Sequence, residues 1–89
     1  MRESVVEAYL RKRVREAGGE AWKFTSPGTR GVPDRIVLLP GGRVWFVELK
    51  RPGAVPAPHQ ARLHEKMRRL GMCVLVLDSI ESIDGLFAR

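Results

Sequence analysis

The sequence predicts an α/β fold in which a small mixed β-sheet is flanked by helices, in the order α-β-β-β-α-β-α. Three observations carry this prediction. An amphipathic helical pattern opens the chain, two apolar runs are joined by a Pro-Gly-Gly turn, and a second helical pattern precedes a last apolar run. Strands joined by a tight turn pair antiparallel, whereas a helical crossover leads to a parallel strand. We therefore expect a mixed sheet, with a right-handed crossover and helices packed against it.

The first helix is predicted over residues 2–17. Apolar residues recur there at spacings of three and four, and basic residues fill most of the opposite surface. Gly18 and Gly19 follow, and glycine supplies the positive φ that commonly ends a helix. The apolar positions are Val5, Val6, Tyr9, Leu10 and Val14.

Three strands are predicted next, over residues 20–25, 34–39 and 43–50. A turn-rich loop at 26–33 separates the first two, and a tight hairpin turn at 40–42 joins the second to the third. The third strand is almost continuously apolar, which is typical of a central strand covered on both faces.

The last part of the chain completes the sheet. After a loop at 51–58 that contains three prolines, a second helix is predicted over about 58–70, ending at Gly71. A fourth strand follows at 72–77, and the tail from Ser79 is predicted to form a short helix. The length and the lack of repeats predict one domain over residues 1–89.

The charge balance favours a polyanionic partner. Sixteen Lys and Arg stand against ten Asp and Glu, a formal net charge of +6, which suits nucleic acid. An anionic membrane surface fits less well, because the first helix has no face of Trp, Phe and Leu opposite its basic residues. With no signal peptide and no apolar run long enough to span a bilayer, we expect a soluble cytoplasmic protein. Cys73, the single cysteine, excludes an intrachain disulfide and is predicted to be a small core residue.

Two carboxylates and a lysine are the candidates for chemistry. Asp34 opens one strand and Glu48 lies near the end of the next, with Lys50 two residues further on the same face. Carboxylate oxygens suit Mg²⁺ or Mn²⁺. A lysine beside such an ion can orient or deprotonate the attacking water, or stabilise a pentavalent phosphate. These residues together suit phosphodiester hydrolysis, although each is also an ordinary feature of a strand.

The hairpin register decides whether the two carboxylates can meet. If Gly41 and Gly42 form a two-residue turn, Asp34 faces Leu49, and the carboxylates of Asp34 and Glu48 point to opposite faces. A one-residue bulge or a longer loop would bring them together. The spacing therefore permits a shared site but does not require one.

The same residues carry a family resemblance. Pro33-Asp34 followed by Glu48-Leu49-Lys50 resembles the PD-(D/E)XK nuclease motif, and nearly the whole chain is similar to the VRR-NUC branch of that superfamily, whose stand-alone members are often phage-encoded. This resemblance implies a restriction-endonuclease-like α-β-β-β-α-β core and cleavage of DNA, often at branches or flaps. The segments that carry it are residues 23–28, 31–35, 40–42 and 47–53, and Gln60.

The resemblance also implies roles for individual residues. Asp34 and Glu48 would ligate Mg²⁺ or Mn²⁺ together with the Leu49 carbonyl, and Lys50 would be the catalytic lysine. Gln60 matches a glutamine that often lines such sites.

A glutamate of the first helix also joins the site in many members of the family. Here it is Glu3 or Glu7, which share a helical face. We favour Glu7, because it lies within the apolar side of the helix, whereas Glu3 is nearer the fraying end.

Other residues receive weaker predictions. Lys23, Arg30 and Arg51 flank the proposed site and are expected to contact DNA phosphates. His59 and His64 lack the i, i+4 spacing of a helical metal pair and are predicted to be surface groups, while Trp22 and Trp45 are predicted to be core residues. No phosphate-binding glycine loop or dinucleotide fingerprint is present, so no organic cofactor is expected.

The leading hypothesis is a Mg²⁺- or Mn²⁺-dependent endonuclease that acts on branched or duplex DNA. We expect a homodimer, because two-fold assembly supplies two active sites for two strands, with the C-terminal segment as one possible interface. One alternative is a non-catalytic DNA-binding module that keeps the nuclease fold. Another is a basic adaptor whose partner is a protein.

Overall fold

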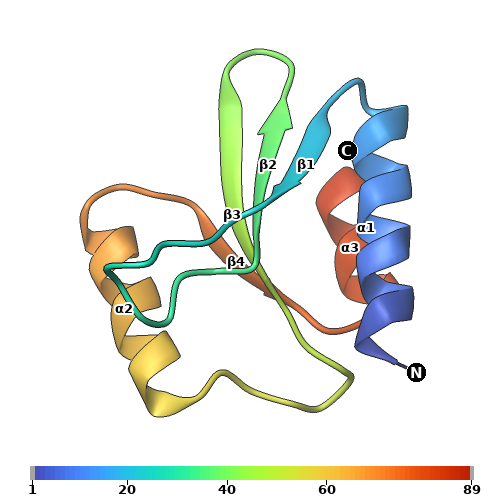
Figure 1. Ribbon diagram of the computed structural model, residues 1–89. Coiled ribbons are helices and arrows are strands. Elements are labelled where there is room, and N and C mark those ends of the chain that lie inside the picture. Colours follow the sequence, from blue (N-terminus) through green and yellow to red (C-terminus); the bar gives the residue numbers. More distant parts are fainter. Residues whose placement is uncertain (1, 89) are drawn as a thin grey trace.

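The computed structural model describes residues 2–88 and confirms the predicted order of elements (Figure 1). Within these residues, no helix is both long enough and apolar enough to cross a membrane. The helices are α1 (Glu3–Glu16), α2 (Pro58–Arg69) and α3 (Ile80–Phe87), and the strands are β1 (Glu20–Lys23), β2 (Arg35–Leu39), β3 (Arg43–Leu49) and β4 (Val74–Leu77).

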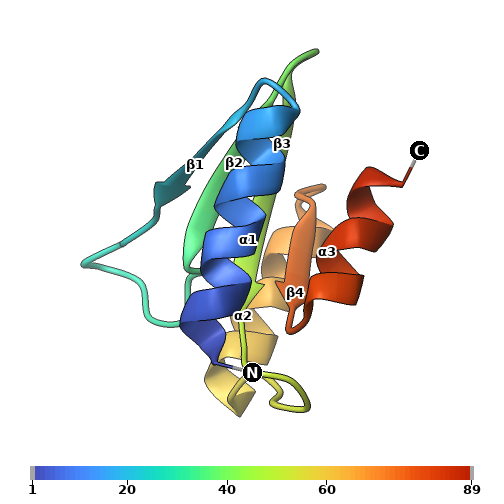
Figure 2. The ribbon, with the colours of Figure 1, turned by 90° about the vertical axis from the view of Figure 1, so that its right-hand side faces the viewer.

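The sheet is mixed, as predicted. Its spatial order is β1-β2-β3-β4, in which the first two pairs are antiparallel and β3 pairs parallel to β4. The parallel pair is the one that α2 connects, because a parallel return needs a crossover rather than a tight turn. Strands β1 and β4 form the two edges (Figure 2).

The hairpin register resolves the question left by the spacing. Leu39 pairs with Arg43 and Arg35 with Val47, so the loop has three residues rather than two. Its two glycines, Gly41 and Gly42, have φ values of +84° and +75°. The next pair below Arg35 and Val47 is Asp34 and Glu48. Residues directly opposite one another point to the same face of a sheet, so the two carboxylates share one face without a bulge.

One face of the sheet carries the hydrophobic core. Helices α1 and α3 pack together against this face (Figure 1). The C-terminal segment, expected as a possible dimer interface, therefore turns its apolar side inward: Ile83 is fully buried, and Leu86 and Phe87 pack against the core. The other buried members are Val6, Leu10, Val14, Val37, Leu39, Val47, Leu49 and Leu77.

The opposite face is covered only in part, by α2. Two corrections to the predicted burial concern this face, and a third concerns the segment that leads into β4. Trp22 is 53% exposed, because it lies on the edge strand β1 beyond the reach of α2. Cys73 is exposed rather than in the core, since it precedes β4 in the turn after α2. His64 is 1% exposed rather than on the surface, because α2 turns it towards the sheet.

Candidate active site

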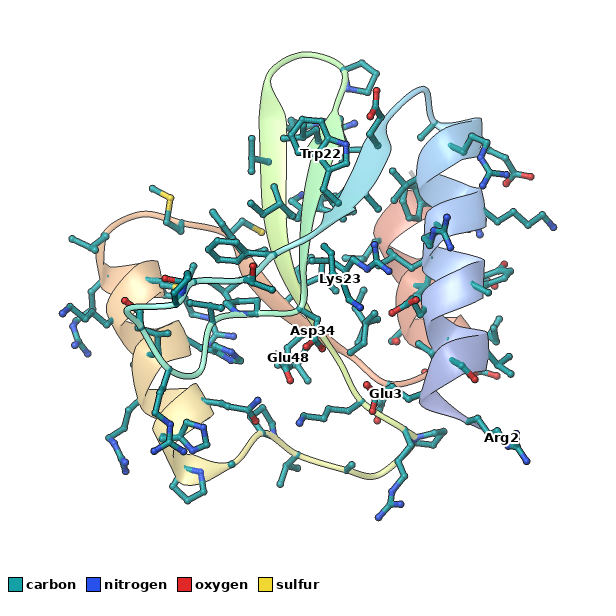
Figure 3. The ribbon with its side chains drawn as sticks, viewed as in Figure 1. Arg2, Glu3, Trp22, Lys23, Asp34 and Glu48 are labelled. Carbon is teal, nitrogen blue, oxygen red and sulfur yellow. The ribbon has the colours of Figure 1, made fainter. Side chains whose placement is uncertain are left out.

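Asp34 is held at the amino end of β2 by neighbouring backbone groups. Its Oδ2 accepts a hydrogen bond from the amide of Leu49 at 2.9 Å, and its carbonyl accepts one from the amide of Phe24 at 2.8 Å. Pro33, just before it, is buried. The bond from Leu49 thus holds the Asp34 carboxylate against β3, next to Glu48 (Figure 3).

Glu48 is a buried carboxylate, only 1% exposed. Its Oε2 forms an ion pair with Lys50 Nζ and accepts a hydrogen bond from Gln60 Nε2, each at 3.2 Å. Its Oε1 has no hydrogen-bond partner among residues 2–88. Burial raises the pKa of Glu48, and the charge of Asp34 raises this pKa further, while the bond from Lys50 lowers it. The effects of burial and of the Asp34 charge on the pKa of Glu48 thus exceed that of the contact with Lys50.

Gln60, a predicted site residue, lies between Lys50 and Glu48 and contacts both. Its Oε1 accepts hydrogen bonds from Lys50 Nζ at 3.3 Å and from the amide of Ala57 at 2.9 Å. The second bond caps the start of α2, where Ala57 has no side-chain oxygen to do so. The Gln60 amide therefore links the first turn of α2 to both Lys50 and Glu48.

His64 is a member of this cluster that the sequence analysis missed. Its Nε2 lies 4.0 Å from Glu48 Oε1 and has no hydrogen-bond partner within residues 2–88. Burial lowers the pKa of His64, and the charges of Arg68 and Lys50 lower it further, against the opposing effect of the Asp34 charge. The sequence contains a signal for this position, because His64 follows Gln60 by one helical turn and so shares its face.

The two candidate glutamates of α1 occupy different surroundings. Glu7, the favoured one, pairs through Oε1 with Arg35 Nη2 at 3.0 Å. Glu3 is the α1 carboxylate whose charge contributes to the raised pKa of Glu48. Figure 3 shows Glu3 at the start of α1, on the side of the molecule where Asp34 and Glu48 lie. Glu7 is therefore engaged by Arg35, whereas Glu3 lies on the side of the carboxylate pair.

The three predicted phosphate-binding residues are all exposed. Lys23 ends β1, Arg30 lies in the loop before β2, and Arg51 follows Lys50. None of them takes part in an ion pair within residues 2–88. Their charges are therefore available to a ligand, but the protein does not hold them in one common geometry.

The oxygen atoms of the site suit a hard divalent cation. Backbone and water would provide part of its coordination shell. Within residues 2–88 no three His, Cys, Asp or Glu side chains gather into a metal-binding group. Asp34 and Glu48 provide a carboxylate pair, and Glu48 Oε1 is buried without a partner. Mg²⁺ is commonly held by one or two carboxylates, with water completing its shell. The Leu49 peptide lies against this pair through its bond to Asp34.

Comparisons with known proteins identify the family. No family model matches the chain. A curated protein named "Putative nuclease p44", from Acyrthosiphon pisum secondary endosymbiont phage 1, is 53% identical over 79 residues, which cover 89% of this chain and 85% of that protein. A solved structure described as "VRR_NUC domain" superposes with a TM-score of 0.91 at 39% identity, covering 98% of this chain and 95% of that one. The chain belongs to the VRR-NUC family.

The two comparisons cover nearly all of this VRR-NUC chain, including both strands that carry the carboxylates. The mixed sheet with three helices is thus the VRR-NUC fold as well as the fold predicted from the sequence. The described surface also has two hollows that lie away from Asp34 and Glu48, one between α1 and β1 and one beside α3.

Proposed function

We propose that this VRR-NUC protein is a Mg²⁺- or Mn²⁺-dependent endonuclease that hydrolyses phosphodiester bonds of DNA, with branched substrates favoured. The observation that carries the proposal is Glu48, a buried carboxylate with one free oxygen, opposite Asp34 and in contact with Lys50. Burying such a charge is costly for a small domain. That cost is understandable where the carboxylate serves a cationic ligand.

Each residue of the site would have its own role in this hydrolysis. When bound, the divalent cation supplies positive charge that offsets the charge of the scissile phosphate. Asp34 and Glu48 would hold it, with the Leu49 carbonyl as a further ligand. The Lys50 ammonium would orient the attacking water and stabilise the charge that develops on the phosphate. Gln60 accepts a hydrogen bond from Lys50 Nζ and donates one to Glu48, and so sets the direction of both side chains.

The substrate and the assembly follow from charge and size. A net charge of +6 suits DNA, and Lys23, Arg30 and Arg51 would contact the phosphates beside the site. Glu3 rather than Glu7 would join the site from α1, because Glu7 is committed to Arg35. An 89-residue chain has little surface with which to hold a branched DNA. A homodimer would provide two active sites for two strands.

A cleavage assay tests the proposal. Four-way-junction, flap and blunt duplex DNA are incubated with wild type in Mg²⁺, Mn²⁺ or EDTA, beside Lys50→Ala, Asp34→Ala and the control Lys66→Ala. Lys66 lies on the exposed side of α2, so this control removes a charge without touching the site. We expect metal-dependent cleavage that falls about 100-fold or more in the two site variants and little in the control.

Metal binding is followed separately by calorimetry with Mn²⁺ and no DNA, where Asp34→Ala should lose the heat of binding. If wild type binds every substrate and cuts none in either metal, the non-catalytic DNA-binding alternative replaces the proposal. If both site variants cut as well as wild type, the assignment of the site is wrong.

A further inference from the structure

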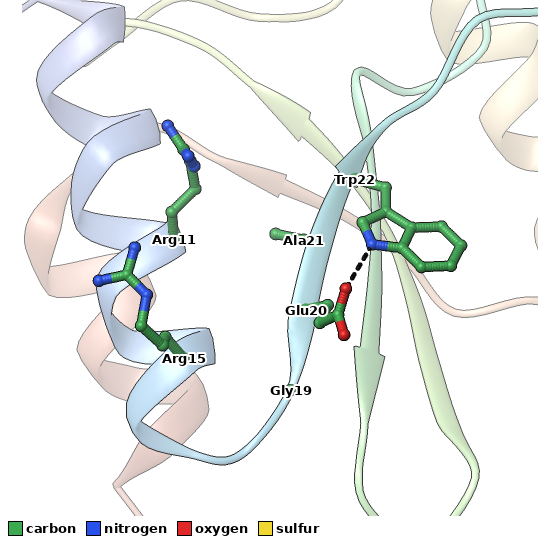
Figure 4. A pocket seen from close by; sticks show the side chains of 6 residues that line it. All are labelled: Arg11, Arg15, Gly19, Glu20, Ala21 and Trp22. Atoms are coloured by element: carbon green, nitrogen blue, oxygen red, sulfur yellow. Dashed lines mark hydrogen bonds between the residues drawn. The ribbon is translucent and has the colours of Figure 1, made fainter.

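A basic hollow lies between α1 and the edge strand β1, outside the carboxylate site. Its volume is about 230 Å³. Arg11 and Arg15 line it from α1, and the segment from Gly19 to Trp22 lines it from the other side (Figure 4). Neither the fold nor the proposed chemistry uses these side chains, so their arrangement needs a separate explanation.

The hollow carries positive charge that the protein leaves without a partner. Arg11 and Arg15 are one helical turn apart and so share a face. No ion pair within residues 2–88 involves either of them. Glu20, the acidic residue of the lining, is turned to the other side of β1, where its Oε1 accepts a hydrogen bond from Trp22 (Figure 4). Two unpaired guanidinium groups on one face suit an anionic ligand.

Trp22 adds an exposed aromatic ring on the far side of the same strand. It is 53% exposed, and its Nε1 bond to Glu20, 2.8 Å long, holds the indole in one orientation. Trp22 pairs with Ile36, two residues from Asp34. It therefore lies on the same face as the two carboxylates, one side-chain row away, which is about 7 Å along the strand. A fixed, exposed indole is a stacking surface for a nucleobase.

The outer edge of β1 connects these two features, and the Ala21 carbonyl on this edge accepts a hydrogen bond from Arg35 Nη1 at 3.4 Å. The amide of Phe24 points towards β2, since it bonds the Asp34 carbonyl. Amides alternate in direction along an antiparallel strand, so those of Ala21 and Lys23 point away from β2, to the open side. A chain that crosses this edge would meet guanidinium groups, outward amides and the indole in succession.

We propose that the edge of β1 binds an unpaired segment of the nucleic-acid substrate, with a base stacked on Trp22 and the adjoining phosphates at Arg11 and Arg15. This inference rests on the proposed function and adds to it where one arm of a branched DNA would run. An unpaired strand fits better than a duplex, because a base inside a duplex must leave its own helical stack before it can stack on a side chain. An acidic peptide could satisfy the arginines but would gain nothing from a flat ring.

Trp22 fluorescence in a Trp45→Phe protein tests the inference, since the chain has only two tryptophans. A 12-nucleotide oligothymidylate, a blunt duplex of equal length and polyglutamate are titrated in EDTA, which prevents cleavage. We expect the single strand to quench Trp22 most strongly. Trp22→Ala, followed by anisotropy of a labelled strand, should weaken binding about tenfold. Arg11→Ala and Arg15→Ala should each lower the salt dependence by about one phosphate contact.

Lys12→Ala is the matched control, because it removes the same charge from α1 without lining the hollow. If Lys12→Ala weakens binding as much as Arg11→Ala, the arginines act only through the net charge that attracts DNA, and the inference fails. It also fails if duplex or polyglutamate quenches Trp22 as strongly as the single strand. If Trp45→Phe does not fold, the ¹⁹F resonances of 5-fluorotryptophan in wild type report on the same ring.

The two proposals fail separately. A protein that binds the single strand through Trp22 and cuts nothing would overturn the proposed nuclease function alone. A protein that cuts branched DNA in metal while its Trp22 signal ignores every oligonucleotide would overturn the edge site alone. All these variants keep Asp34, Glu48 and Lys50. A loss of binding measured in EDTA therefore cannot result from a loss of catalytic activity.

Discussion

At the scale of single residues, burial of the Glu48 carboxylate lowers the stability of the fold, and the proposed reaction uses the same carboxylate to bind the metal. Its carboxylate is 1% exposed, with Lys50 and Gln60 on one oxygen and no partner within residues 2–88 on the other. The raised pKa of Glu48 means that folding favours its protonated form over the ionised form. A neutral side chain of the same shape should therefore suit the metal-free fold better, while it removes the charge that a cation needs.

We predict that Glu48→Gln is more stable than wild type at pH 7 in EDTA and is inactive in metal. The folded-state pKa of Glu48 lies above the unfolded value of about 4.3, so the penalty is absent below that pH. It grows as the pH rises through the folded-state pKa. The gain in melting temperature should thus be largest near pH 7 and fade towards pH 4.

Thermal unfolding between pH 4 and pH 7.5 measures this gain. Glu65→Gln, at an exposed position of α2, is the control and should change little, since exposed ion pairs contribute about 0–1 kcal/mol. A Glu48→Gln protein that melts below wild type at pH 7 would contradict the prediction. It would mean that the bond from Lys50 outweighs the cost of burial.

At the scale of elements, the site depends on how the loop before β2 meets α2. Gly31 in this loop has a φ of +87°, and a Cβ there would lie 3.2 Å from Gln60 Cα and 3.3 Å from His59. The loop continues directly into Asp34, so its contact with α2 brings Asp34 and Gln60 into one site.

We predict that Gly31→Ala destabilises the protein by about 1–2 kcal/mol, because an L side chain is strained at positive φ. This corresponds to a melting temperature lower by about 4–8 °C for each kcal/mol. The added methyl group should also displace Gln60 and lower the rate of cleavage. Gly28→Ala is the control in the same loop, since a Cβ there meets nothing within 4 Å. Equal melting temperatures for the two variants would show that the loop can move away without cost.

The elements themselves were predicted well from local pattern. The periodicity of α1 and the turn signals around β2 and β3 depend on neighbouring residues alone, and the structure confirms their types and order. The hairpin register was left open, because Pro-Gly-Gly is compatible with a loop of two or three residues. Pairing across the whole sheet selects three, and that choice places Asp34 opposite Glu48.

At the scale of the whole molecule, the uncovered part of the sheet bears on assembly. Val44 and Met72 are 41% and 43% exposed beyond the reach of α2, whereas the apolar side of α3 is used in the core. If a homodimer forms, its interface is therefore expected on this uncovered side rather than on α3.

We predict that light scattering after gel filtration gives twice the chain mass of 10.0 kDa. Val44→Glu should shift the protein towards the monomer, because a charge in an apolar interface is costly to bury. Val55→Glu is the control, since Val55 is 79% exposed in the loop before α2. A wild type of single-chain mass at all concentrations would contradict the homodimer.

The sequence by itself determined the order of helices and strands, the mixed sheet, and the residue types Asp34, Glu48, Lys50 and Gln60 as candidates for chemistry. These follow from periodicity, turn residues and short motifs, which act over a few positions. The tertiary structure alone decided the burial of His64 beside Glu48, the exposure of Trp22 and the pairing of Glu7 with Arg35. Those depend on which parts of the sheet α1 and α2 cover, and on charges brought together from distant segments, which no local pattern specifies.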